Sequence, residues 1–312
     1  MQIQEKGLEW RNYFYSEFEL RRQHFFQLVI LSFIWGSSFL FLRIAAPEFG
    51  PILLITVRVL IAGLVLLVPL YYSKEWPVLK KHWRAIFVSG IFGTAIPFTL
   101  VAYSALYATS SFVSILNATV PIFSVVVVYF WLKEKPSKTA FLGVTTGFIG
   151  VLILNGDKVS VSETFGWLAV STGLAASFFY SLTSPHRKLY LEGVSPLVVT
   201  VGSQLFSAMA MMPLALFFLP EQMPGLAAWG SAIFLGIVCT AFALLLFFRL
   251  LMNVGIEKTI SVTYLIPVSA IFLGFSVLGE PITWQIITGG SLILLGVGFT
   301  TEFIRFGAAK KH

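Results

Sequence analysis

Charged residues and cysteines are scarce in this 312-residue sequence. Asp, Glu, Lys and Arg together make up 11% of it and hydrophobic residues 57%, whereas a soluble domain carries about 25% charged residues. With a mean hydropathy of +0.87, the chain needs lipid as its solvent, so we expect a lipid bilayer around it. The one cysteine, Cys239, excludes a disulfide within the chain and any metal site built on cysteine spacing.

Groups for catalysis are also few. No Asp or Glu lies in the middle of an apolar run, the four histidines lie at run ends, and no Gly-rich phosphate loop or paired nucleophile and base is recognisable. We therefore expect no catalytic residue, no metal site and no cofactor. This favours a transporter over the alternative, an intramembrane enzyme acting on a lipid-like substrate. The missing intramembrane carboxylate also argues against a proton relay, which favours an exporter, facilitator or exchanger.

What the sequence does contain is a series of long apolar runs. A membrane helix takes about 20 predominantly apolar residues, and ten runs of about this length are separated by charged or Gly/Pro-containing breaks. The sequence therefore predicts an all-α integral membrane protein with ten transmembrane helices. The runs cover residues 24–44, 52–72, 84–105, 109–132, 138–155, 166–186, 196–219, 227–250, 258–279 and 283–304.

The basic residues indicate the orientation of these runs. The net charge of +7 does not predict nucleic acid as a partner, because no basic stripe with interleaved aromatic residues is present. If the N-terminus is cytoplasmic, 18 of the 21 Lys and Arg residues fall in cytoplasmic segments, and only Arg43, Lys158 and the intramembrane Arg58 do not. We expect both termini in the cytoplasm, with an interfacial or unstructured polar arm at residues 1–23 and a basic tail at 305–312.

A constant offset relates the two halves of the chain. Because each half holds an odd number of runs, the second half enters the membrane upside down relative to the first. The sequence thus predicts two inverted five-helix repeats, 24–155 and 166–304, and such repeats place the substrate site at their interface. Residues that coincide at a shift of 146 are Pro121 and Pro267, Glu134 and Glu280, Gly90 and Gly236, Ile91 and Ile237, and Thr94 and Thr240.

Several stretches carry a family resemblance. The segment Ile34-Trp35-Gly36-Ser37-Ser38-Phe39, the segment Pro51 to Gly63, and the run from Ala105 to Leu132-Lys133-Glu134 resemble the EamA domain of the drug/metabolite transporter superfamily. Pro267 and Leu278-Gly279-Glu280 resemble a second copy, so the resemblance covers about residues 26 to 304. It implies a ten-helix carrier of the inner (plasma) membrane that moves amino acids, related metabolites or drugs. The second copy departs from the pattern, with Tyr180-Ser181 in place of the tryptophan-glycine pair.

The expected substrate cavity lies between the two halves at mid-membrane. We expect the protein's partner there to be a small-molecule substrate. Trp35 lies about 16 Å along its helix, where it either forms a rigid wall beside the substrate or fills space next to the following glycine. Tyr180 is its counterpart. The amide of Asn117 needs a partner, either substrate or a neighbouring helix, whereas Thr94 and Thr240 are expected to bond carbonyls of their own helices. The candidate substrate-binding residues are Trp35, Ser38, Phe39, Asn117, Tyr180, Ser184, Thr263 and Tyr264.

Two prolines and three charged residues complete the predicted site. Pro121 and Pro267 each remove a backbone hydrogen bond at mid-membrane, so we expect helix breaks or hinges there. Arg58 could attract a carboxylate, but we favour a structural role in which it reaches the outer headgroups or a helix end. Glu134 and Glu280 lie at helix ends where water reaches, and we expect them to be gate latches or anchors.

Glycines line one face of the fifth run and one face of the tenth. Small residues at helical spacing let two helices approach closely in a membrane. We expect these two faces to pack together within one chain, and a homodimer contact is the alternative. The glycines are Gly143, Gly147 and Gly150 in the fifth run and Gly289, Gly290, Gly296 and Gly298 in the tenth.

Overall fold

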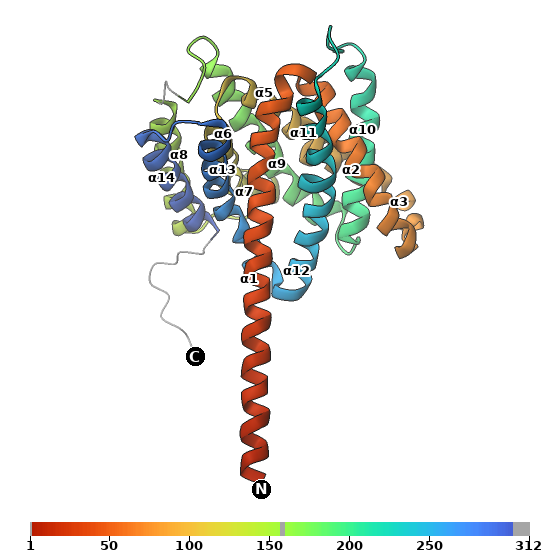
Figure 1. The fold of residues 1–312 in the computed structure, drawn as a ribbon, viewed down its shortest axis with the longest axis vertical. Coiled ribbons are helices and arrows are strands. Elements are labelled where there is room, and N and C mark those ends of the chain that lie inside the picture. The colour runs from red at the N-terminus through yellow and green to blue at the C-terminus, as the bar shows by residue number, and fades with distance from the viewer. Residues whose placement is uncertain (1, 157–159, 302–312) are drawn as a thin grey trace.

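The protein is a bundle of helices from which the first part of α1 projects (Figure 1). The structure is a computed structural model that describes residues 2–156 and 160–301, with the backbone alone for 2–22, 256–258 and 260. The predicted tail at 305–312 lies outside the described residues. In chain order the helices are α1 (Gln2–Phe49), α2 (Pro51–Ser73), α3 (Trp76–Lys81), α4 (Trp83–Gly90), η1 (Ile91–Ala95), α5 (Ile96–Tyr107), α6 (Ser110–Asn117), α7 (Val120–Leu132), α8 (Lys138–Asn155), α9 (Gly166–Tyr190), α10 (Pro196–Ala215), α11 (Leu226–Gly236), η2 (Ile237–Phe242), α12 (Ala243–Ile260), α13 (Val262–Leu278) and α14 (Trp284–Thr300).

Many of these helices are long and apolar enough to cross a membrane. Seven stretches of the described chain meet that requirement by length and composition, and α13 and α14 are apolar but shorter, at 17 residues each. The 25-residue α9 is long enough but rich in serine and threonine. The protein is therefore an all-helical, multi-pass membrane protein. The seven stretches are Gln23–Phe49, Pro51–Ser73, Trp83–Tyr107, Ser110–Leu132, Lys138–Asn155, Pro196–Ala215 and Leu226–Gly255.

Within the described residues, each predicted apolar run coincides with helical structure, but four runs are divided. Residues 84–105 fall in α4, η1 and α5, residues 109–132 in α6 and α7, residues 227–250 in α11, η2 and the first part of α12, and residues 258–279 in the end of α12 and in α13. The two η segments are π-helices, which are rare and often found at functional sites. The predicted polar arm also differs from expectation, since the backbone of residues 2–22 continues α1 as helix.

The two symmetry-related prolines have different effects on their helices. Pro121 lies in the first turn of α7, after a break at residues 118 and 119, where its missing N–H has no helical acceptor to lose. Pro267 lies inside α13, and the helix continues through it, so the predicted break at Pro267 is wrong. One lost hydrogen bond in a helix packed among others does not end it. The nearby interruption is instead at Gly255, whose φ of 81° departs from helical geometry within α12.

Helices from the two halves of the chain pack against each other throughout the bundle. Helix α2 packs on α10, α8 packs on α14, and α1 packs on both α11 and α13, while α9 packs on α5, α6 and α7. One hydrophobic core therefore contains buried side chains from both halves, such as Leu54, Phe112 and Ile293. The two halves of the sequence therefore form one bundle with a common core.

The α8–α14 contact brings two backbones together, as the glycine pattern predicts. A Cβ atom at Gly143 would lie 2.5 Å from the carbonyl oxygen of Gly296, and one at Gly150 would lie 2.7 Å from that of Gly289. Real Cβ atoms do not approach so closely, so glycine is needed at these positions. The two glycine faces are used within one chain, as we expected.

We predict that Gly143→Ala destabilises the protein by about 1–3 kcal/mol, because backbone atoms of α14 must move to admit the methyl group. Gly230→Ala is the matched control, since a Cβ there meets nothing within 4 Å. Thermal unfolding of the purified chain in detergent measures both. Equal unfolding temperatures for the two variants would contradict the close α8–α14 packing.

Candidate functional site

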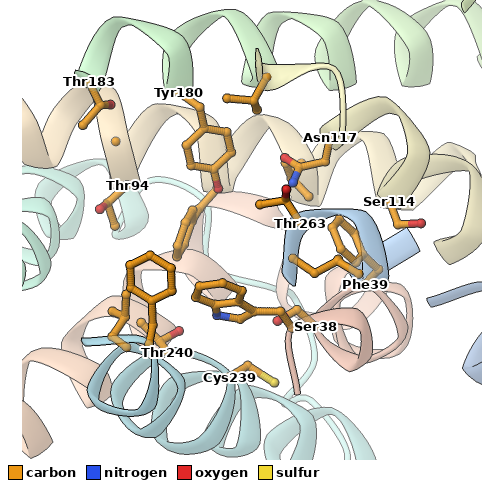
Figure 2. A pocket seen from close by; sticks show the side chains of 18 of the residues that line it. Ser38, Phe39, Thr94, Ser114, Asn117, Tyr180, Thr183, Cys239, Thr240 and Thr263 are labelled. Carbon is orange, nitrogen blue, oxygen red and sulfur yellow. The ribbon is translucent and has the colours of Figure 1, made fainter. Parts of the chain in front are cut away.

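A cavity of about 460 Å³ lies among helices of both halves (Figure 2). Its lining comes from α1, α2, η1, α5, α6 and α7 in the first half and from α9, α10, η2, α12, α13 and α14 in the second. Hydroxyl and amide side chains alternate with aromatic rings in the wall. Its volume fits a small organic molecule.

Most of the predicted site residues meet at this cavity. Nine of them line it, and Figure 2 shows Tyr180, Asn117 and Thr263 projecting toward one another. Four others, Ser184, Tyr264, Glu134 and Glu280, are not in the lining. The nine are Trp35, Ser38, Phe39, Arg58, Asn117, Pro121, Tyr180, Thr263 and Pro267.

Ser184 and Tyr264 miss the cavity for simple helical reasons. One residue along a helix turns the side chain by about 100°, so Thr183 of α9 lines the cavity while Ser184 is exposed on another face. On α13, Thr263 faces the cavity, whereas the hydroxyl of Tyr264 pairs with that of Thr301. The sequence placed both residues next to a residue that lines the cavity, but it does not indicate which side of these helices faces inward.

The two π-helices place a threonine each at the cavity wall. Thr94 lies in η1 and Thr240 in η2, and both line the cavity. The Thr240 hydroxyl donates to the carbonyl of Leu235, five residues earlier, at 2.8 Å. It also accepts a hydrogen bond from Nε of Arg58 at 2.9 Å. Thr240 therefore bonds its own helix, as expected, and holds a charged residue as well.

Arg58 faces the cavity and not the headgroups. Its side chain is buried, with 6% exposed, and its guanidinium carbon lies 4.2 Å from the centroid of the Phe98 ring. The side chain therefore does not reach the surface of the bundle, and its observed contacts are with Thr240 and Phe98. The cation–π contact and the bond to Thr240 hold the guanidinium inside the bundle.

A second arginine also lines the cavity, although the sequence suggested that it is a cytoplasmic charge. Arg187 lies one helical turn after Thr183 on α9, and its Nε donates to the hydroxyl of Ser89 at 3.0 Å. Because it lies at the end of an apolar run, the sequence favoured a role in setting the orientation of the helix in the membrane. Because i and i+4 residues share a helix face, its pairing with Thr183 was nonetheless visible in the sequence.

Several buried polar atoms in the lining have no hydrogen-bond partner among the described residues. They include Asn117 Oδ1, Thr183 Oγ1, Ser203 Oγ and Gln204 Oε1. Leaving such an atom unpaired costs about 1–3 kcal/mol, so each is expected to meet water or a ligand. Ser203 and Gln204 were missed from the sequence, although with Thr200 they form a polar i, i+3, i+4 face on the otherwise apolar α10.

Aromatic side chains supply the apolar part of the wall. The Trp35 ring packs on Phe247 with centroids 5.4 Å apart, and Tyr180 packs on Phe98 at 6.1 Å. These contacts join α1 to α12 and α9 to α5. The two residues that the repeat relates, Trp35 and Tyr180, thus each contact a phenylalanine that also lines the cavity.

Glu280 is buried and not at a wet helix end, so its expected exposure to water is wrong. The carboxylate is 7% exposed and accepts hydrogen bonds from the backbone N–H and the hydroxyl of both Ser110 and Ser111, at 2.7–3.2 Å. A carboxylate at the start of a helix is stabilised by the free N–H groups there. This contact, which we call the Glu280 clasp, joins the end of α13 to the start of α6.

Glu134, the repeat-related glutamate, is in a different environment. It forms an ion pair with Lys188 at 2.8 Å, and the two side chains are 55% and 62% exposed. Exposed pairs of this kind contribute about 0–1 kcal/mol. Of the two glutamates that the offset of 146 residues relates, Glu280 is therefore buried and Glu134 is exposed. Within the described part of the chain, no three His, Cys, Asp or Glu side chains lie close enough together to hold a metal ion.

Comparison with known proteins shows similarity to transporters over most of the chain. The model of the EamA-like transporter family matches residues 25–156 and again residues 167–301. An uncharacterized transporter of Archaeoglobus fulgidus is 25% identical over 269 residues, which cover 84% of this chain and 93% of the relative. The uncharacterized transporter YoaV of Bacillus subtilis is 25% identical over 283 residues, which cover 88% and 95%.

A solved structure shares the fold. It is described only as a crystal structure of a protein, and it covers 90% of this chain and 97% of its own with a TM-score of 0.62 and 20% sequence identity. At this identity the likeness extends to the arrangement of helices and no further.

We predict that Glu280→Gln lowers the free energy of unfolding by about 3 kcal/mol, because an amide can accept fewer of the four hydrogen bonds and carries no charge toward the α6 N-terminus. Glu134→Gln is the matched control, with an expected loss below about 1 kcal/mol. Unfolding in detergent, followed by heating or denaturant, compares the two. A loss for Glu280→Gln no larger than that for Glu134→Gln would contradict the clasp.

Proposed function

Because this chain belongs to the EamA-like transporter family, we propose that it is a secondary transporter that moves a small metabolite across the cytoplasmic membrane by alternating access. The observation that carries the proposal is the cavity of about 460 Å³, lined by both halves of the chain. The substrate is an amino acid, a related compound or a drug-like molecule. The protein works as an exporter, facilitator or exchanger, and binding and rearrangement suffice without a catalytic step.

The proposed architecture is ten membrane helices in two inverted repeats, 24–155 and 166–304, with the polar arm and the basic tail in the cytoplasm. Two features of the described helices support it. The π-helices η1 and η2 begin at Ile91 and Ile237, 146 residues apart, which is the offset of the sequence repeat. The family model also matches twice, over 25–156 and 167–301.

Helix packing supports the same symmetry. The first helix of one repeat packs on helices late in the other: α1 contacts α11 and α13, and α9 contacts α5, α6 and α7. Helices α2 and α10 pack on each other, as do α8 and α14, so these two pairs lie on the proposed two-fold axis. Inverted repeats that share such an axis can exchange conformations, which opens the central cavity first to one side and then to the other.

The two glutamates support an assignment of the state. In the proposed orientation the Glu280 clasp lies on the outer side and holds α6 against α13, whereas Glu134 lies on the cytoplasmic side in an exposed ion pair. The clasp closes the outer end of the cavity. The structure is then the inward-facing state, and outward opening requires the Glu280 carboxylate to leave Ser110 and Ser111.

We predict that filling the cavity stops transport. Cells that express the protein should release a set of metabolites that cells without it retain, and Thr263→Trp should abolish most of that difference because the indole occupies the cavity. Val268→Trp is the matched control on the same helix, since Val268 is 56% exposed on the outer face of α13. An untargeted comparison of metabolites in the medium measures all four strains.

Two outcomes would contradict the proposal. If Thr263→Trp and Val268→Trp, at equal amounts of protein in the membrane, release the same metabolites, the cavity is not the pathway. If no metabolite distinguishes cells with the protein from cells without it, during growth and after loading with an amino-acid mixture, the transport function itself is wrong.

A further inference from the structure

The cavity carries positive charge that no residue in its wall balances. Arg58 and Arg187 both line it, and none of the lining residues that the structure describes is Asp or Glu. Arg58 is almost wholly buried. A charged side chain at this depth in a membrane protein is costly, and it is usually paired or functional.

The partners of Arg58 are neutral. Among the described residues, its hydrogen bond is from Nε to the Thr240 hydroxyl, and its other contact is the face of Phe98. A guanidinium has five N–H donors in a planar fork that matches a carboxylate or another oxyanion. The Thr240 hydroxyl uses one of these donors, so the other N–H groups of Arg58 remain available to bind an anion.

The close backbone approach at Arg58 does not itself require an arginine. A Cβ at Gly236 would lie 3.0 Å from the carbonyl oxygen of Arg58, and a Cβ at Gly90 would lie 2.8 Å from that of Ser203. Arg58 on α2 and Ser203 on α10 thus make similar backbone contacts. Because a serine makes this contact on α10, the contact does not account for the guanidinium at position 58.

The rest of the wall indicates the other parts of the ligand. The rings of Trp35, Tyr180 and Phe247 offer apolar surface. The buried side chains of Ser203 and Gln204, 1% and 3% exposed, carry atoms without a protein partner. A ligand with an apolar body and at least one hydrogen-bonding group besides its charge would satisfy both kinds of surface.

We propose that the substrate is a small organic anion, whose acidic group binds Arg58 and whose apolar body lies against the aromatic wall. Arg187, one turn from the cavity-lining Thr183, adds positive potential that attracts the anion into the cavity. This inference rests on the transport function proposed above and names the chemical class of its substrate. A cation would meet two arginines, and a neutral molecule would leave the Arg58 fork without its partner.

The charge of the cavity can be measured with thiol reagents before the substrate is known. Asn117→Cys in a Cys239→Ser background places one thiol at the cavity wall of the full chain. Its rates of reaction in detergent are compared for an anionic reagent, 2-sulfonatoethyl methanethiosulfonate, and a cationic one, 2-(trimethylammonio)ethyl methanethiosulfonate. Met223→Cys in the same background is the reference, because Met223 is 86% exposed.

We expect the ratio of the anionic to the cationic rate to be about tenfold higher at position 117 than at position 223, because the buried Arg58 acts across a poorly screened cavity and the more exposed Arg187 adds to its potential. Arg58→Gln and Arg187→Gln should each lower the ratio at 117 by about threefold, and Arg58→Lys should retain it. Arg84→Gln is the matched control, since Arg84 is exposed and outside the lining.

Failure of the inference differs from failure of the proposed function. Equal ratios at 117 and 223, or ratios at 117 that do not change when Arg58 is replaced by glutamine, overturn the anion assignment and leave transport intact. A thiol at 117 that reacts with neither reagent overturns the aqueous cavity and both proposals. Among metabolites whose release Thr263→Trp abolishes, we expect a net negative charge at neutral pH, and a neutral or cationic one would support transport but contradict this inference.

Discussion

Every backbone polar group that faces lipid must be hydrogen-bonded within the protein, and the shape of this molecule depends on that constraint. Irregular backbone is therefore tolerated within the membrane where protein covers it. The π-helices η1 and η2, and the break before Pro121, all border the central cavity. Side chains on these segments occupy positions that a regular helix would not give them. The departures from helical geometry thus create the binding surface.

Some contacts recur at the offset of 146 residues, whereas the side chains of the cavity wall differ. Glycines at the ends of α4 and α11 lie against α10 and α2, and threonines reach the cavity from the two π-helices. At the contacts with these glycines, α2 carries an arginine and α10 a serine. In the proposed transport cycle, a repeated backbone of this kind would change between two equivalent shapes while the unequal side chains bind a ligand that has two different ends.

The sequence predicted the features that follow from composition and local pattern. The apolar runs, the close packing of α8 on α14 and the mid-membrane residues that line the cavity are examples, because each depends on residues near one another along the chain. The sequence did not predict the burial of Glu280, whose partners are 170 residues away. It also placed Ser184 where Thr183 lies, because the serines and threonines of α9 fall on several faces and do not mark its orientation. Arg187 was overlooked since a basic residue at the end of a run has an adequate explanation in topology.

The Glu280 clasp makes substitutions at three positions depend on one another. A protein with the buried glutamate but not its donors would be less stable than one with the complete clasp. The same holds for a protein with the two serines but not their acceptor. Either would also be less stable than a protein in which all three residues are replaced. Substitutions at 110, 111 and 280 are therefore expected to be inherited together. A relative that has lost the acid at 280 should also have exchanged the hydroxyl pair, and apolar side chains would then hold the end of α13 against the start of α6.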